Sequence, residues 1–187
     1  KKKLENNLEY INNYYSSFGW FNSETNFKID TVKNKRVAIT YYIKKNTAYK
    51  IGTIKKEINS PIVDSLFDTI QNKSLIIRGN QYSSIDFNKE RERISKIFRN
   101  SGLYYFDPSY IEFEADSVKT NHKVNIVYKI PNQKIREDDT TRTEPFKIYK
   151  ISEVQIVTDY NYKNRNESIS DSIKYNGYHL YSYDKLK

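Results

Sequence analysis

The stretch RNSGLYYFDPSYIEFEAD, Arg99–Asp116, contains the end of a predicted helix, one glycine, a cluster of aromatic residues and a predicted strand. The stretch NYYSSFGWFNSETNFKID, Asn13–Asp30, shows the same order earlier in the chain. Only 5 glycines occur among 187 residues, yet Gly19 and Gly102 hold equivalent places, 83 residues apart. A glycine in the left-handed region can end a helix without the steric penalty of a side chain. The two matched junctures therefore indicate a repeated structural unit.

The elements around the second juncture predict one complete unit, residues 48–131. Apolar residues alternate with polar ones in its strands and recur at helical spacing in its helices, and turn residues separate the elements. The predicted elements are, in order, a strand at 49–58 (YKIGTIKKEI), a helix opened by Ser60 and Pro61, a helix from Asp86 to Gly102, and strands at 110–116 and 124–130.

The flanking regions predict incomplete units. Residues 1–47 match the second half of the complete unit, with one amphipathic helix and a β-hairpin that turns at 33–35. Residues 132–145 hold one apolar residue and clustered charges, so they are predicted to be a linker. Residues 146–187 are predicted to begin a further unit with a strand at 146–160, because YKISEV at 149–154 matches YKIGTI at 49–54. Residues 161–182 show no clear period and are predicted to be irregular.

The predicted fold class is α+β, with repeated βααββ units. An amphipathic helix and a hairpin with one apolar face bury these surfaces when helices pack on one face of a sheet. The residues after each glycine would fill the seam between helix and sheet. The predicted structural juncture consists of Gly19, Trp20, Gly102 and Tyr104.

The net charge of +9 suggests a nucleic-acid or anionic-lipid binder as the alternative function. The excess of basic over acidic residues is five in residues 1–47, three in 48–131 and one in 132–187. Because acidic residues neighbour most basic ones, the sequence shows no focused basic patch, and we expect no nucleic-acid partner. An accessory domain of an enzyme is a third possibility, which only flanking sequence would support.

No catalytic, cofactor-binding or metal-binding constellation is predicted. The chain has no cysteine and 2 histidines, His122 and His179, that are far apart in sequence. A transition-metal site needs several such ligands together. Glu112 and Glu114 would share one strand face, which is the ordinary arrangement of solvent-facing acids on an edge strand. No apolar run approaches the about 20 residues of a membrane-spanning helix.

The pattern resembles that of POTRA (polypeptide-transport-associated) domains. RERISKIFRNSGLYYFDPSYIEFEAD, residues 91–116, is similar to POTRA domains of the BamA/TamA outer-membrane assembly family, and YKISEVQIVTDYNY, residues 149–162, resembles TamA-like lipoproteins of Bacteroidota (TamL). The resemblance implies tandem POTRA units, each with a three-stranded mixed sheet, two helices on one face and the last strand in the middle. Residues 161–182 exceed the usual POTRA connection.

The resemblance also implies a function in protein assembly or export on the periplasmic face of the outer membrane. Its partners would be unfolded outer-membrane or surface protein clients, other subunits of an assembly machine and a C-terminal β-barrel of the same chain. An extended partner would pair with an exposed sheet edge by β-augmentation. The candidate edges are Thr25–Thr31 in the partial unit and, in the complete unit, Tyr110, Ile111, Glu112, Phe113, Glu114, Ala115 and Asp116.

Overall fold

A computed structural model describes residues 2–32, 36–137 and 140–183. The predicted turn at 33–35 lies outside the described residues. The chain divides into two compact units, Lys1–Ile148 and Tyr149–Lys187. Each unit is described by itself.

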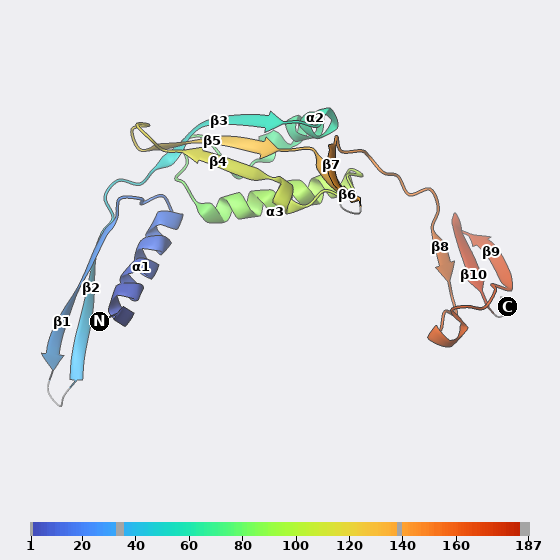
Figure 1. Cartoon of the computed structure of the whole chain (residues 1–187), viewed down its shortest axis with the longest axis horizontal. Coiled ribbons are helices and arrows are strands. Elements are labelled where there is room, and N and C mark those ends of the chain that lie inside the picture. Colours follow the sequence, from blue (N-terminus) through green and yellow to red (C-terminus); the bar gives the residue numbers. More distant parts are fainter. Residues whose placement is uncertain (1, 33–35, 138–139, 184–187) are drawn as a thin grey trace. The chain divides into compact units, whose positions relative to one another are not determined.

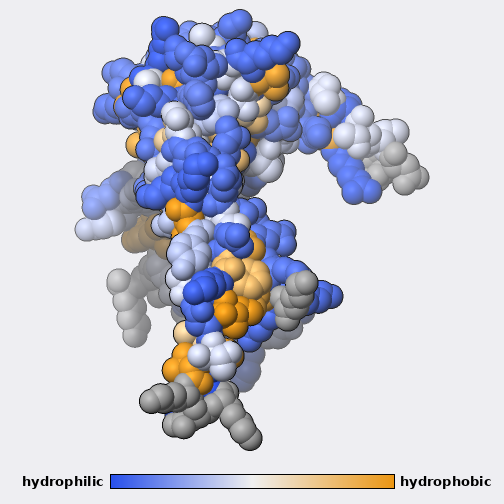
Figure 2. Space-filling model, turned by 90° about the vertical axis from the view of Figure 1, so that its left-hand side faces the viewer, coloured by the Kyte–Doolittle hydropathy of each residue, from blue (hydrophilic) through white to orange (hydrophobic). Residues whose placement is uncertain are grey.

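The first unit begins with one helix and a β-hairpin. Helix α1 (Lys2–Ser17) contacts strand β1 (Glu24–Val32), which pairs antiparallel with β2 (Arg36–Lys44). Only one helix lies near this hairpin in the described chain, so much of the hairpin's apolar surface stays open (Figure 2). The exposed apolar residues include Ile29, Val37, Ile39 and Ile43.

The middle of the first unit has the predicted βααββ order. Strand β3 (Lys50–Ile58) leads to helix α2 (Pro61–Ile70), a 3-10 turn η1 (Gln71–Lys73) and helix α3 (Ser84–Asn100). A second 3-10 turn, η2 (Pro108–Tyr110), precedes β4 (Glu112–Asp116) and β5 (Lys123–Ile130). The sheet order is β3-β5-β4, with β3 parallel and β4 antiparallel to β5 (Figure 1). The predicted mixed sheet with a central last strand is confirmed.

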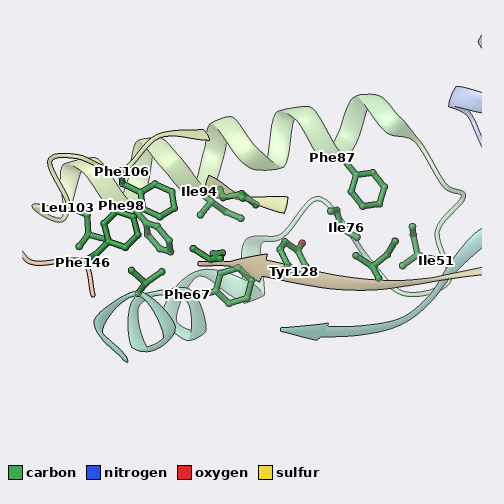
Figure 3. Packing of buried hydrophobic residues seen from close by; sticks show 14 of the residues in the cluster. Ile51, Phe67, Ile76, Phe87, Ile94, Phe98, Leu103, Phe106, Tyr128 and Phe146 are labelled. Atoms are coloured by element: carbon green, nitrogen blue, oxygen red, sulfur yellow. The ribbon is translucent and has the colours of Figure 1, made fainter. Parts of the chain in front are cut away.

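One face of this sheet carries the core. Strand β5 buries every second side chain from Val124 to Ile130. The Phe67 ring of α2 packs on the Tyr128 ring of β5, with ring centres 5.0 Å apart, and Phe98 of α3 belongs to the same buried cluster (Figure 3). Both helices therefore cover one face, as predicted.

Residues 132–145 differ from the predicted linker. They contain a hairpin made of β6 (Gln133–Glu137) and β7 (Thr140–Glu144); residues 138 and 139 lie outside the described part. Polar residues such as Thr and Arg pair readily across a two-stranded ribbon, because backbone hydrogen bonds need no apolar face. Having a single apolar residue, Ile135, therefore did not prevent strand pairing here.

The predicted strand at 146–160 is wrong over most of its length. Only β8 (Gln155–Val157) is extended and paired, while Phe146 is buried in the core of the first unit. In the first unit, the matching YKIGTI segment pairs with β5 and with residues 79–82. Residues 150–154 lie outside the strand pairings of the described chain, although the Val154 carbonyl accepts a hydrogen bond from the His179 N–H at 3.4 Å. The same sequence pattern therefore does not become a strand here.

Residues 161–182 are more ordered than predicted. They form η3 (Tyr162–Asn164), β9 (Asp171–Tyr175) and β10 (Tyr178–Ser182). The sheet order is β8-β10-β9, with β8 parallel and β9 antiparallel to β10, which matches β3-β5-β4 in order and direction. The turn is Asn176–Gly177, with φ of 47° and 83°. Asn-Gly is the strongest short hairpin signal, and the sequence reasoning overlooked it.

Candidate functional site

The predicted binding edge Tyr110–Asp116 coincides with β4 only from Glu112 onward. Tyr110 was predicted to begin the strand at 110–116, but it belongs to η2 and its ring centre lies 5.0 Å from that of Phe146. The reason is local. Pro108 opens the 3-10 turn and the Asp107 carboxylate accepts a hydrogen bond from the Ser109 N–H at 2.9 Å, so the strand begins only after this turn ends.

The alternation along β4 follows the predicted faces. Ile111 is buried, and the half-buried ring of Phe113 packs 4.8 Å from Phe87 and 4.9 Å from Tyr128. Ala115 lies on the same face, opposite Ile126, but it is exposed. Glu112 and Glu114, which were predicted to share a solvent-facing strand face, are both exposed, and so is Asp116 on the same face.

The hydrogen bonds of β5 define which backbone groups of β4 point outward. The Asn59 N–H donates to the Ile130 carbonyl at 3.1 Å, and the Lys50 N–H donates to the His122 carbonyl at 3.0 Å. The backbone N–H and C=O groups of even-numbered residues in β5 therefore point toward β3. Those of odd-numbered residues such as Val127 point toward β4, because the direction of these groups alternates along a strand.

In the antiparallel register, Glu112, Glu114 and Asp116 stand opposite odd-numbered residues of β5. Directly opposite residues that face each other exchange both backbone hydrogen bonds. The backbone groups of these three acids therefore point toward β5. Phe113 and Ala115 present their N–H and C=O groups to the outer edge, and the described chain places no strand there. Proline at Glu112 or Glu114 would thus break the ladder rather than alter the edge.

Arg91 covers the beginning of this edge, a contact that the sequence reasoning missed. Its Nε donates to the Ile111 carbonyl at 2.8 Å, and its guanidinium lies 4.9 Å from the centre of the Phe113 ring. Arg91 lies on the same face of α3 as the buried residues Phe87 and Ile94. This helical spacing brings Arg91 close to the sheet. Only the short segment Phe113–Ala115 is left open for a partner strand.

The open face beside the edge carries a row of alternating charges. The Lys129 ammonium contacts the Glu114 carboxylate and lies 3.6 Å from that of Glu57. Glu114 in the first place, and then Glu57, raise the pKa of Lys129 above its usual value. Glu112 and Asp116 extend this row, so an excess of negative charge borders the edge.

The other predicted edge, Thr25–Thr31, lies in β1. Strand β1 pairs only with β2, so its outer side has no strand partner in the described chain.

The two glycine junctures have the predicted left-handed backbone. Gly19 has φ of 86° and Gly102 has φ of 95°. Trp20 packs against Tyr15, with ring centres 5.8 Å apart. Tyr104 was predicted to fill the helix–sheet seam, but it is 68% exposed. The seam holds Leu103 and Phe106 instead, because a tight turn at this point directs only some of the consecutive side chains inward.

Gly19 also joins the first half-unit to the complete one. Its carbonyl accepts a hydrogen bond from the Tyr49 N–H at 2.8 Å, and Phe21 packs on Tyr49 and Tyr82 at 5.0 and 5.1 Å. A Cβ added at Gly19 would lie 3.0 Å from the backbone carbonyl oxygen of Tyr49 and 3.1 Å from the Cβ of Tyr82. The glycine therefore permits a close approach as well as a helix end.

We expect Gly19→Ala to lower the free energy of unfolding by about 2 kcal/mol, from left-handed strain plus the close contact. Gly79→Ala is the matched control, because Gly79 has φ of 89° and nothing lies within 4 Å of its added Cβ. Gly79→Ala should lower the free energy of unfolding by about 1 kcal/mol, from the left-handed backbone strain alone. Urea unfolding of both variants measures the difference. Equal losses would show that the approach of Tyr49 and Tyr82 adds no constraint.

The described part of the chain lacks two features, a cluster of metal ligands and a membrane-spanning helix. No cluster of three or more His, Cys, Asp or Glu side chains is placed to hold a metal ion there. None of its helices has the length and apolar character needed to cross a membrane.

Comparison with known proteins finds similarity only among solved structures. Neither a protein-family model nor a curated protein matches this sequence. Among solved structures, BamA from Haemophilus ducreyi lacking POTRA domains 1–3 is 15% identical with a TM-score of 0.41, over 72% of this chain and 24% of that one. POTRA domains 3–5 of Haemophilus influenzae BamA are 11% identical with a TM-score of 0.41, over 97% of this chain and 80% of that one. The chain thus spans about a quarter of the first structure's length. The closeness to TamA-like lipoproteins stays a prediction.

Proposed function

We propose that this chain is a POTRA-type binding and scaffolding module on the periplasmic face of a Gram-negative outer membrane, active in outer-membrane protein assembly or export. One observation carries the proposal. The βααββ unit exposes the outward backbone groups of Phe113 and Ala115 on edge strand β4. The resemblance of residues 91–116 to POTRA domains gives this edge its biological setting.

The proposed mechanism is β-augmentation by an unfolded client or an extended partner segment. Main-chain hydrogen bonds supply affinity without requiring a particular client sequence. The edge is only a few residues long, because Arg91 covers its beginning and β4 ends at Asp116. A short edge bordered by acids resists indiscriminate pairing between copies. Binding would therefore be weak and reversible, as a module that handles many clients requires.

The repeat supports the proposed domain arrangement. Residues 1–47 are a partial POTRA unit and residues 48–131 a complete one. Residues 149–187 are the beginning of another, since Phe146 packs in the core of the complete unit. The matching strand order in β8-β10-β9 supports the last assignment. Further subunits and a C-terminal β-barrel in the same chain complete the proposed assembly machine, as the sequence resemblance implies.

The test replaces the outward-facing residue Ala115. Ala115→Pro removes one edge N–H, and proline is tolerated at edge positions whose N–H faces solvent. We expect cross-linking of the purified chain to a urea-denatured outer-membrane protein precursor, captured on dilution, to fall about fivefold, which corresponds to one hydrogen bond of about 1 kcal/mol. The melting temperature should stay unchanged.

Two variants control this experiment. Ala115→Ser keeps the edge N–H, so it should cross-link normally. Glu114→Pro removes an N–H that faces β5, so it should lower the melting temperature. Full cross-linking by a correctly folded Ala115→Pro variant would contradict the proposed function of the β4 edge.

A further inference from the structure

We propose that the outer edge of β3, from Ile54 to Ile58, is a second peptide-binding edge. Its partner would be an extended segment that carries an aliphatic side chain and, two residues away, Lys or Arg. Strands β3 and β4 form the two opposite edges of the three-stranded sheet. The proposal therefore does not depend on binding at Ala115.

Hydrogen bonds reveal the free backbone groups of β3. The Asn59 N–H points toward β5, so the backbone N–H and C=O groups of Glu57 and Lys55 point toward β5 as well. Ile54, Lys56 and Ile58 consequently direct their N–H and C=O groups outward. In the described chain no backbone partner reaches these groups.

The first part of β3 is already occupied, which limits the binding edge to its second part. The Ile51 N–H donates to the Asn80 carbonyl at 2.8 Å, and the Tyr82 N–H donates to the Tyr49 carbonyl at 2.9 Å. An irregularity in the pairing between Ile51 and Ile54 separates the two parts. There the Asn125 side-chain oxygen accepts the Thr53 N–H at 2.9 Å.

A groove accompanies the free part of the edge on the helix-covered face. It has a volume of about 180 Å³ and is partly open to solvent. Ile54 and Ile76 supply apolar walls, and Tyr128 lies beside Ile76 in the close-up view (Figure 3). At its polar end the Ser74 hydroxyl and the Tyr128 hydroxyl are 3.2 Å apart. The groove is lined by Ile54, Gln71, Ser74, Ile76 and Tyr128.

A partner strand would direct side chains into this groove. Ile54 shares the helix-covered face with Ile126, its neighbour in β5. The partner residue opposite Ile54 would place its side chain on the same face, because paired residues share a face. A groove of about 180 Å³ with apolar walls from Ile54 and Ile76 has room for one aliphatic side chain.

Charge supplies the second element of the partner pattern. Two residues along β3, the Lys56 ammonium lies 2.7 Å from the Asp64 carboxylate and 2.5 Å from that of Asp68. Two carboxylates and one ammonium leave one negative charge at this point. The partner residue opposite Lys56 would face this surplus, which favours Lys or Arg and disfavours Asp or Glu.

The test uses the peptide acetyl-Ser-Thr-Ile-Thr-Lys-Thr-Ser-amide as the probe, added to the 15N-labelled chain. We expect amide shifts at Ile54, Lys56 and Ile58, and unchanged shifts at Phe113 and Ala115. Replacing the probe's Lys by Glu should weaken binding about fivefold, the size of an exposed charge effect. N-methylation of the probe's alternate, edge-facing amides should abolish binding.

Variants of the chain separate the two edges. Gln71→Trp, at an exposed residue of the groove wall, should weaken probe binding by filling the groove. Ala115→Pro should bind the probe normally even if it loses client cross-linking. Asp64→Asn/Asp68→Asn should remove the preference for Lys over Glu. Shifts confined to Phe113 and Ala115, no binding by the unmethylated probe, or equal binding of the methylated probe would each overturn the β3 proposal.

Discussion

Replacing Glu90 by Ala should lower the free energy of unfolding of the first unit by about 3 kcal/mol, the usual cost of breaking a largely buried ion pair. Glu90 is only 1% exposed. Its two carboxylate oxygens accept hydrogen bonds from Arg93 Nε and Nη2, both at 2.8 Å, and one of them also accepts the Leu75 N–H at 3.1 Å. Without Glu90, the Arg93 guanidinium and the Leu75 N–H would lose their buried acceptor.

The buried carboxylate of Glu90 also makes the free energy of unfolding depend on pH. Burial by itself would raise the pKa of Glu90, but Arg93, the Leu75 N–H and the Ser74 hydroxyl together hold that pKa below its usual value. A lowered folded-state pKa stabilises the fold fully above the unfolded pKa of about 4.3. This contribution is lost as the pH falls from about 4.3 through the folded-state pKa.

Urea unfolding of the wild type and of Glu90→Gln between pH 7 and pH 3 measures this effect. Glu90→Gln keeps the shape of the side chain but not its charge, so the difference in unfolding free energy should shrink as the pH falls below about 4.3. Glu92→Ala, at an exposed acid on the same helix, should change stability by less than about 0.5 kcal/mol. A difference between wild type and Glu90→Gln that stays constant down to pH 3 would contradict the lowered pKa.

Replacing Phe146 by Ala should lower the free energy of unfolding of the same unit by about 3 kcal/mol, as expected for a buried Phe. Phe146 is 4% exposed, and its ring centre lies 5.1 Å from that of Phe106 and 5.0 Å from that of Tyr110. Its N–H donates to the Ser60 hydroxyl oxygen at 3.1 Å. The chain after β7 is therefore fastened to the core at the start of α2.

Thermal unfolding of the chain tests this attachment. Ser60→Ala should lower the free energy of unfolding by about 1 kcal/mol, because it removes the hydroxyl that accepts the hydrogen bond from the Phe146 N–H. Ile148→Ala is the matched control, since Ile148 is two residues further on and exposed, and it should cost less than about 0.5 kcal/mol. An unchanged melting temperature for Phe146→Ala would show that residue 146 belongs energetically to the following segment.

The sequence by itself determined the elements and their order in the complete unit. Helical spacing from Phe87 to Phe98 and strict alternation from Val124 to Ile130 are local patterns, so they predict which side chains enter the core. The glycine at position 102 predicted a left-handed helix end for the same local reason. Even the missed hairpin at Asn176–Gly177 was visible in the sequence.

Only the tertiary structure decided the features that depend on partners distant in sequence. Glu90 sits among exposed charges on a helix, and its burial follows from where residues 74 and 75 cross α3. Phe146 joins the preceding unit because Phe106 and Tyr110 offer it an apolar surface. The outward amides of Phe113 and Ala115 follow from the pairing register with β5. A local pattern specifies which face a side chain occupies, but the neighbouring strand determines which backbone groups remain free.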